Sequence, residues 1–269
     1  MENNRTETLY IVSPCYNEEE MLPKSAPVFV STLDRLICSE RISPESRVLL
    51  VDDGSTDATR ETMKRIREEY PDRVETLFLK YNSGEFRAFL AGMKAAAAKA
   101  DVIVTIDCDL QDDIEAIDEM LELRVGGDEI VFGCRPSRDS DRPFYRFCAG
   151  SFYFLMRAFG SKIIPHSSEF RLMTKNAVVQ LLAADKKNLF LHAEIPLLDL
   201  PQGKVYYARK ARVAGKSSYN YVKLIRLAAS AMKEYTFFFE TVGLVTAVSG
   251  VLVAVLLDRC EKRGRADKG

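Results

Sequence analysis

Short apolar runs rich in β-branched residues alternate with helical stretches over the first half of the chain, and this alternation limits the fold more than any other feature. The intervening stretches, 57–70, 84–100 and 113–125, have a helical composition. Near-continuous apolar strands separated by helices predict an α/β domain with a mostly parallel sheet that is covered on both faces. The apolar runs are LYIVS (9–13), RVLLVDD (47–53), VETLFL (74–79), DVIVTID (101–107) and EIVFG (129–133).

Composition narrows the class of protein. The 269 residues, 47% hydrophobic and 29% charged, suffice for one sizeable domain with a small appendage. A net charge of −1 argues against a broad basic face, so we expect no nucleic-acid partner. The six cysteines include no C-x-x-C pair, and with two histidines they offer no zinc-ligand spacing, so we expect free thiols. The polar N-terminus lacks the apolar core of a signal peptide, so we expect the first domain to stay in the cytosol.

Three polar clusters follow predicted strands. They are SPCYNEEE (13–20), VDDGSTD (51–57) and DCDLQDD (107–113). Ligands of parallel sheets bind at the carboxyl ends of the strands, so the fold should bring these clusters to one edge. The sequence therefore predicts a binding site at that edge.

Asp107 and Asp109 are the two acids that most need an explanation. If the backbone stays extended there, both face the same crevice and raise each other's pKa. A divalent cation, Mg²⁺ or Mn²⁺, removes that cost and binds the oxygens of a diphosphate. We therefore predict a metal held by Asp107 and Asp109, with a purely structural role as the alternative.

Structural explanations also stay open for the second cluster. Asp57 has the character of a helix N-cap, because an aspartate there satisfies free backbone N–H groups. Asp52 and Asp53 precede Gly54 at a strand end, where a turn accommodates them equally well.

These clusters, together with GCR (133–135) and EFRLM (169–173), resemble the inverting family 2 glycosyltransferases with the GT-A fold, and most closely the group of dolichol-phosphate mannose synthase and bacterial polyprenyl-phosphate glycosyltransferases. The resemblance runs from about Tyr10 to Tyr219. It implies a catalytic role for Asp109, Glu169 and Arg171. The residues that it implies for nucleotide-sugar binding are Pro14, Tyr16, Glu18, Asp52, Asp53, Asp107 and Gln111.

Two departures from the family pattern affect the predicted site. Glu85 stands where many relatives have a lysine after the glycine, which weakens a phosphate role for that loop. Glu169 stands where relatives commonly have the aspartate of Gly-Asp-Phe-Arg, so the carboxylate is kept on a longer side chain. Arg171, two residues further on, is expected to orient this acid or a phosphate.

The acceptor decides whether the reaction needs a base. A sugar hydroxyl requires a general base, whereas a lipid monophosphate is already ionised near pH 7 and needs mainly cations to hold it in line. Arg135, Arg146, Arg212 and Lys216 follow the donor motifs and are predicted to bind an acceptor phosphate. A solvated basic surface is the alternative for each of them.

The C-terminal part predicts a membrane anchor. Thr241–Leu257 carries no charge and lies at the short end of the ~17 to 25 residues that span a bilayer. The aromatic and basic stretches 142–160 and 221–240 suit helices at the headgroup boundary, with buried amphipathic helices as the alternative. Basic residues flank both ends of the uncharged run, so its topology stays open.

We therefore predict a membrane enzyme that moves a sugar from a UDP- or GDP-sugar to a polyprenyl (dolichol- or undecaprenyl-type) phosphate with Mg²⁺ or Mn²⁺. Residues 1–215 form the cytoplasmic GT-A catalytic domain, 216–240 an amphipathic juxtamembrane segment, 241–257 the transmembrane helix and 258–269 a basic tail. The alternatives are transfer to a saccharide hydroxyl in surface polysaccharide synthesis and a non-catalytic sugar-nucleotide-binding protein.

Overall fold

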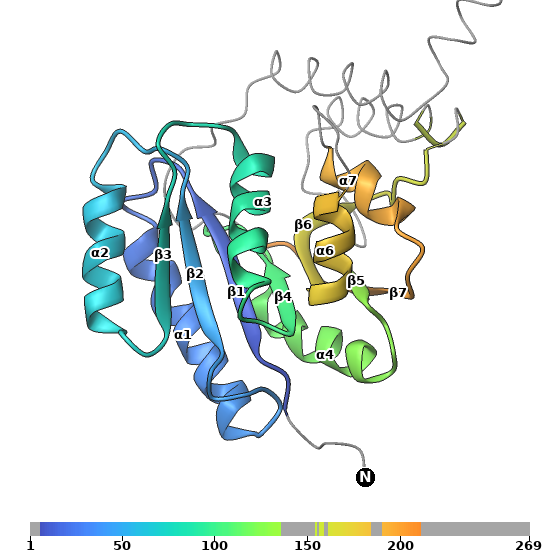
Figure 1. Ribbon diagram of the computed structural model, residues 1–269, viewed down its shortest axis with the longest axis horizontal. Helices are drawn as coiled ribbons and strands as arrows, with labels where there is room; N and C mark the ends of the chain where they lie inside the picture. Colours follow the sequence, from blue (N-terminus) through green and yellow to red (C-terminus); the bar gives the residue numbers. More distant parts are fainter. Residues whose placement is uncertain (1–5, 136–153, 155, 159–160, 184–189, 211–269) are drawn as a thin grey trace, which may run out of the picture. The chain divides into compact units, whose positions relative to one another are not determined.

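The described residues form one sheet of seven strands in the order β3-β2-β1-β4-β6-β5-β7 (Figure 1). The structure is a computed structural model that describes residues 6–135, 154, 156–158, 161–183 and 190–210. The chain divides into two compact units, and the sheet belongs to the first, residues 1–143 and 164–218. The strands are β1 (Leu9–Cys15), β2 (Arg47–Asp52), β3 (Val74–Phe78), β4 (Val102–Thr105), β5 (Ile130–Cys134), β6 (Ser167–Thr174) and β7 (Gln202–Tyr206).

The sheet is mostly parallel, as the sequence predicted. β1 pairs in parallel with β2 and β4, β2 with β3, and β5 with β7. β6 runs antiparallel between β4 and β5. The carboxyl ends of the other six strands therefore lie at one edge of the sheet, and the amino end of β6 lies there with them.

Helices cover both faces, which confirms the predicted layering. One hydrophobic core lies under α1 (Leu22–Cys38), α2 (Thr59–Glu69) and α4 (Ile117–Val125), the last preceded by η1 (Ile114–Ala116). The opposite core lies under α3 (Glu85–Ala96), α6 (Lys175–Ala183), α7 (Leu191–Glu194) and η2 (Ile195–Leu197). Alternate residues along the strands supply the two cores, as the twofold period of a strand requires.

Helix α3 packs unusually close to the sheet. A Cβ atom added to Gly92 would lie 2.4 Å from Val12 Cγ1 and 2.8 Å from Val51 Cγ2. The glycine is therefore needed at this helix position despite its low helix propensity. This close approach packs the middle of α3 against β1 and β2.

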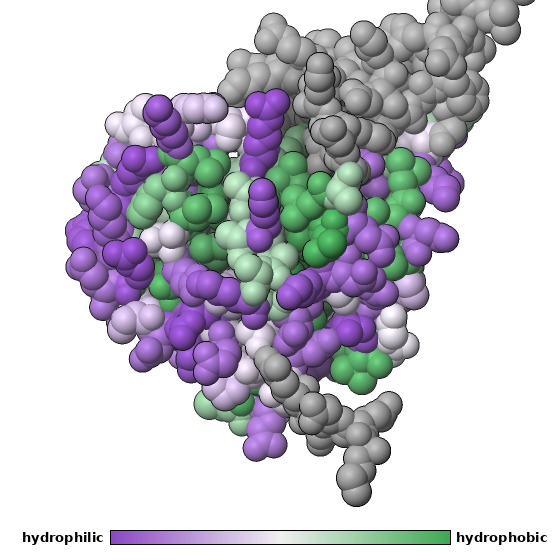
Figure 2. All heavy atoms as spheres, viewed as in Figure 1, coloured by the Kyte–Doolittle hydropathy of each residue, from purple (hydrophilic) through white to green (hydrophobic). Residues whose placement is uncertain are grey.

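The surface over α2 is hydrophilic, whereas hydrophobic residues gather at the centre of the face seen in Figure 2. α2 buries Thr59, Thr62, Met63 and Ile66 and presents its charged residues to solvent. The helix is thus a polar cover for one face of the sheet.

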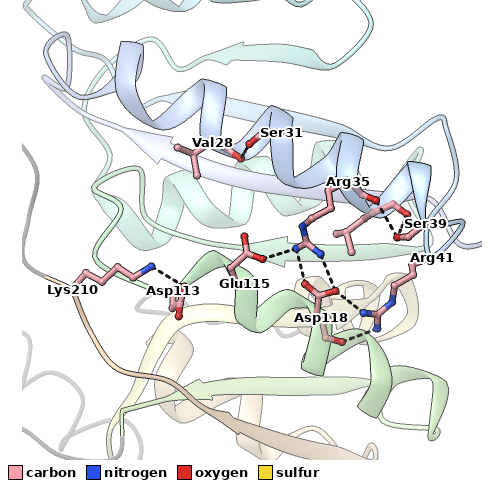
Figure 3. A network of polar contacts seen from close by, with 10 residues as sticks. Val28, Ser31, Arg35, Ser39, Arg41, Asp113, Glu115, Asp118 and Lys210 are labelled. Atoms are coloured by element: carbon pink, nitrogen blue, oxygen red, sulfur yellow. Dashed lines mark hydrogen bonds and ion pairs between the residues drawn. The ribbon is translucent and has the colours of Figure 1, made fainter.

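An ion-pair network ties α4 to α1 (Figure 3). Asp118 Oδ2 lies 2.6 Å from Arg35 Nη2, and Asp118 Oδ1 lies 2.6 Å from Arg41 Nη1. Glu115 Oε2 accepts a third contact from Arg35 at 3.0 Å. The hydrogen bond from Arg35 is the main cause of a lowered pKa for Asp118. The pairs are partly exposed, so each contributes about 0 to 1 kcal/mol and their main effect is to fix the start of α4.

No helix in the described part of the chain is long and apolar enough to cross a membrane. The predicted transmembrane run, Thr241–Leu257, lies outside the described residues, as do the stretch 221–240 and most of 142–160. The anchor and the domain boundaries after residue 215 therefore stay predictions.

Candidate active site

The three polar clusters lie together at the carboxyl edge of the sheet, where the sequence placed them. The first follows β1, the second follows β2 and the third follows β4, and these three strands are neighbours in parallel register. Thr105 pairs with Arg171, so Glu169 on the antiparallel β6 lies beyond the end of β4. Acids from the donor motifs and from the EFRLM motif therefore share one edge.

The loops after β1 and β2 are joined by hydrogen bonds. The amide of Asn17 donates to Ser55 Oγ at 3.0 Å, and the amide of Glu18 donates to Thr59 Oγ1 at 2.8 Å. The amide of Thr56 donates in return to Asn17 Oδ1 at 2.9 Å. Asn17 has φ of 55°, a left-handed conformation that asparagine tolerates better than most residues. Tyr16 and Glu18 therefore lie in a loop that is hydrogen-bonded to its neighbour, whereas Pro14 lies within β1 and pairs with Val51.

Asp52 has partners within the protein. The side chain is fully buried, and Oδ2 lies 2.7 Å from Arg60 Nε of α2. Oδ1 accepts from the amide of Ser55 at 2.9 Å. Arg60 also donates to the carbonyl of Leu79. Asp52 thus fixes the start of the loop as well as lying at the predicted nucleotide site.

Asp53 holds the loop that leads into α3. Oδ1 accepts from the amide of Ser83 at 2.8 Å and from its hydroxyl at 2.9 Å, and Oδ2 accepts from the amide of Gly84 at 2.9 Å. Gly54 has φ of +69°, and a Cβ atom there would lie 2.4 Å from the carbonyl carbon of Tyr81. The turn role considered for Asp52 and Asp53 is therefore present in the structure.

Asp57 lies one residue before Ala58, which caps α2, and Asp57 Oδ1 accepts from the amide of Thr59 at 3.0 Å. The side chain thus serves the helix start, close to the N-cap role that the sequence left open.

The backbone does not stay extended through Asp107 and Asp109. This corrects the prediction that an extended backbone points both side chains into the same crevice. β4 ends at Thr105, and residues 108–110 form a turn in which Leu110 has φ of 54°. Asp109 Oδ1 accepts from the amide of Gln111 at 3.1 Å within this turn. The chain turns here because the Asp109 side chain accepts a hydrogen bond from the amide two residues further on, which favours a turn over an extended backbone.

Asp107 lies in a carboxylate-rich environment. Desolvation, followed by the charges of Glu85, Asp112, Asp109 and Glu169, raises the pKa of Asp107 well above its usual range. Glu85, the departure from the family pattern, is the strongest of these charged neighbours. The set consists of hard oxygen donors, which suit Mg²⁺ or Mn²⁺ better than softer metals. The described residues contain no group of three or more His, Cys, Asp or Glu side chains arranged to hold a metal by themselves.

Glu169 forms a buried ionic unit with Arg171 and His192. Oε2 lies 2.5 Å from Arg171 Nη2 on the same strand, and Oε1 lies 2.7 Å from His192 Nε2 of α7. Burial opposes ionisation of Glu169, but the charges of Arg171 and His192 outweigh it and lower the pKa of this carboxyl to about 2. A carboxylate held in this way has little tendency to take up a proton at neutral pH.

Two nitrogens of the buried Arg171 side chain, Nε and Nη1, make no hydrogen bond to any of the described residues. Nη2 donates to the carbonyl of Ser168 at 2.9 Å in addition to Glu169. Arg171 therefore contacts the acid through Nη2, and its Nε and Nη1 donors are not used by the described residues.

Arg135 joins the acidic loop through Asp112. Its Nη2 lies 3.3 Å from Asp112 Oδ1, which also accepts from Tyr207 Oη at 2.6 Å. Burial lowers the pKa of Arg135, whereas Asp112 and Tyr207 raise it, and the net direction is upward. Arg135, the first of the predicted acceptor-binding cations, is thus a permanent charge within the acidic edge.

Gln111 is engaged by the segment after β7. Its Oε1 accepts from Arg209 Nη2 at 2.5 Å, and its backbone carbonyl accepts from the amide of Lys210 at 2.8 Å. The other predicted acceptor cations, Arg146, Arg212 and Lys216, lie outside the described residues.

His192 and Tyr207 are site residues that the sequence analysis did not identify. His192 stands in FLHAEIP and Tyr207 in VYYAR, and neither stretch resembles a known catalytic motif. Both reach the edge through tertiary packing, since α7 folds back onto β6 and β7 runs beside β5. The sequence shows only two adjacent tyrosines, Tyr206 and Tyr207, and this pattern does not indicate a hydrogen-bond partner.

Comparison with known proteins agrees with this arrangement. The sequence profile described as glycosyl transferase family 2 matches residues 10–182. The uncharacterized glycosyltransferase YkoT of Bacillus subtilis is 37% identical over 253 residues, which cover 90% of this chain and 74% of the relative. The prophage bactoprenol glucosyl transferase homolog of Escherichia coli is 31% identical over 242 residues, which cover 88% of this chain and 76% of the relative.

A solved structure shares the fold. The mannosyltransferase PcManGT of Pyrobaculum calidifontis, solved in complex with GDP-Man and Mn²⁺, superposes with a TM-score of 0.54 at 17% identity. The match covers 82% of this chain, which spans 61% of that mannosyltransferase. The described part therefore has the predicted GT-A-like α/β fold, and the chain belongs to glycosyl transferase family 2.

Proposed function

We propose that this protein transfers a sugar from a nucleoside-diphosphate sugar to a polyprenyl phosphate at a membrane surface. Family membership supports sugar transfer, and the relative named as a bactoprenol glucosyl transferase homolog supports a polyprenyl acceptor. The local structure supports the same acceptor class independently.

The observation that carries the proposal is the ionisation state of Glu169. A sugar hydroxyl acceptor needs a base that accepts a proton, and such bases commonly have a pKa near the working pH. Glu169 is instead held ionised between Arg171 and His192, with a pKa of about 2. A lipid phosphate carries its nucleophilic oxygen already ionised, so this site suits it without a proton acceptor.

The edge carries carboxylates that suit a cation bound to the donor diphosphate, and cationic side chains that suit the acceptor phosphate. Asp107 and Asp109 supply the carboxylates that would hold a divalent cation on the donor diphosphate, because the crowded acids around Asp107 favour a bound cation. A divalent cation held by these carboxylates, Mg²⁺ or Mn²⁺, would neutralise the charge that develops on the leaving diphosphate. The complex of the mannosyltransferase with Mn²⁺ supports the choice of ion.

The protein's own groups would position the reaction. Arg135 lies beside the acidic loop as a permanent cation, and Lys216 and Arg212 follow in the sequence as further candidates for the acceptor phosphate. An acceptor oxygen held in line attacks the anomeric carbon while the bond from that carbon to the diphosphate breaks, which inverts the anomeric configuration.

The membrane location belongs to the same proposal. A polyprenyl chain resides in a bilayer, so the catalytic edge needs access to the membrane surface. Thr241–Leu257 is the uncharged run proposed to anchor the chain, with the catalytic domain in the cytoplasm.

A turnover screen tests the proposal. Full-length protein in mild detergent is incubated with UDP- and GDP-sugars, Mn²⁺ and a short polyprenyl phosphate, and lipid-linked sugar is measured. Asp107→Asn and Asp109→Asn should abolish transfer and weaken Mn²⁺-dependent nucleotide binding, whereas Glu115→Gln, an exposed acid of the α1–α4 network, should match wild type. Normal turnover of both aspartate variants in the presence of a chelator would contradict the metal role.

A further inference from the structure

Two segments far apart in the sequence are clasped together next to Asp109. Residues 111–113 follow the metal-site acids, and residues 207–210 follow β7. We call their paired contacts the clasp. It comprises Tyr207 Oη to Asp112 Oδ1 at 2.6 Å, Arg209 Nη2 to Gln111 Oε1 at 2.5 Å, the amide of Lys210 to the carbonyl of Gln111 at 2.8 Å, and Lys210 Nζ to Asp113 Oδ1 at 2.9 Å.

The buried half of the clasp centres on Tyr207. Tyr207 is 5% exposed and Asp112 is 4% exposed, so the hydrogen bond between their side chains is shielded from water. Tyr207 Oη also lies 2.6 Å from Ser168 Oγ, and its ring packs edge-on against Phe170 at 5.4 Å. Burial and the Asp112 carboxylate raise the pKa of Tyr207, so the phenol stays a donor.

The outer half is more exposed. Lys210 donates to Asp113 in Figure 3 with 61% of its side chain in solvent, so that pair adds little. The backbone bond from Lys210 to Gln111 does not depend on side-chain order. The clasp therefore rests on one buried side-chain bond and one backbone bond.

The turn that the clasp holds is strained. Leu110 has φ of 54°, a left-handed conformation that costs a non-glycine residue about 1 to 2 kcal/mol. Such a conformation persists only where neighbouring contacts determine it. The hydrogen bond from the amide of Gln111 to Asp109 Oδ1 spans Leu110, and the clasp holds Gln111 through its carbonyl.

We propose that Tyr207 is a positioning residue for the donor site: through Asp112 and the clasp it keeps the Leu110 turn in the conformation that presents the Asp109 carboxylate. This inference rests on the proposed function. It also assigns Gln111 a second role, since its side chain and carbonyl connect the donor loop to the chain that continues into Arg212 and Lys216.

The test compares Tyr207→Phe with Tyr206→Phe in the full-length protein. Tyr206 ends β7, is 62% exposed and serves as the matched control. Binding of Mn²⁺ with UDP, and of Mn²⁺ with GDP, is measured by calorimetry, and thermal stability is recorded for each variant. Tyr207→Phe should weaken nucleotide binding about tenfold, corresponding to about 1.4 kcal/mol, and Tyr206→Phe should not.

A second variant separates positioning from simple core packing. Leu110→Gly removes the cost of the left-handed conformation, so in the Tyr207→Phe background it should restore part of the lost nucleotide affinity although the Tyr207 hydroxyl stays absent. If Tyr207→Phe lowers stability but binds Mn²⁺ and nucleotide as wild type does, the positioning role is wrong. If wild type binds neither UDP nor GDP with Mn²⁺, the proposed function fails together with this inference.

Discussion

Replacement of Glu169 by glutamine should destabilise the protein in a way that depends on pH. Burial raises the pKa of Glu169, but Arg171 and His192 outweigh burial and lower this pKa from 4.5 to about 2. A difference of that size corresponds to about 3 kcal/mol of folding free energy at neutral pH. Because the folded pKa is the lower one, this contribution is complete above about pH 4.5 and is lost as the pH falls toward 2.

Glu169→Gln should therefore be less stable than wild type by about 3 kcal/mol at pH 7, and the gap should shrink by roughly half at pH 3. The assay is urea denaturation of the full chain at pH 7, 5, 4 and 3, followed by circular dichroism because the chain contains no tryptophan. The difference in free energy of unfolding between wild type and the variant removes the pH dependence that the other carboxylates contribute to both proteins.

Glu115→Gln is the matched control, since Glu115 is 62% exposed in its pair with Arg35. It should cost less than about 1 kcal/mol at every pH. A Glu169→Gln variant as stable as wild type at pH 7, or a gap that does not change with pH, would refute the assignment of Glu169 as a buried, ionised partner of Arg171 and His192.

Three further predictions follow from the same contacts and motifs. Gly54→Ala should lower the free energy of unfolding by about 2 kcal/mol or more, because it combines positive φ with a clash against Tyr81, and equal stability would contradict the close approach. Lys216→Ala should raise KM for polyprenyl phosphate about tenfold with donor binding unchanged, whereas Arg135→Ala should weaken both because it contacts Asp112; an unchanged acceptor KM in both variants would argue against a phosphate acceptor. Removal of the chain from Thr241 onward should reduce the amount in the membrane fraction, and full-length protein that stays in solution without detergent would contradict the anchor.

The fold was predictable from sequence where apolar runs are long. β1, β2 and β3 begin at Leu9, Arg47 and Val74, as their runs predicted, because buried parallel strands need continuous apolar residues. β7 was not predicted because it is a strand at the edge of the sheet with one buried residue, Val205, and so lacks a run of apolar residues. The antiparallel insertion of β6 was not readable, since pairing depends on distant parts of the chain.

Some residues of the candidate site were likewise predictable from local sequence, and others were not. The residues predicted to bind the donor, such as Asp107, follow strands, so the topology rule for parallel sheets predicted the edge at which they lie. The Leu110 turn was missed because leucine gives no signal for a left-handed conformation. His192 and Tyr207 act through contacts with residues 23 and more positions away, which no local pattern encodes.

The most direct test of the proposed function compares two acceptors that differ in one group. Wild-type protein is given the same nucleotide-sugar and Mn²⁺ with either a polyprenyl phosphate or the free polyprenol of equal chain length, and initial rates are measured from pH 6 to 8. Transfer to the phosphate, with no product from the alcohol, is predicted because Glu169 is held ionised and does not accept a proton. Transfer to the alcohol or to a saccharide hydroxyl, with none to the phosphate, would contradict the proposal.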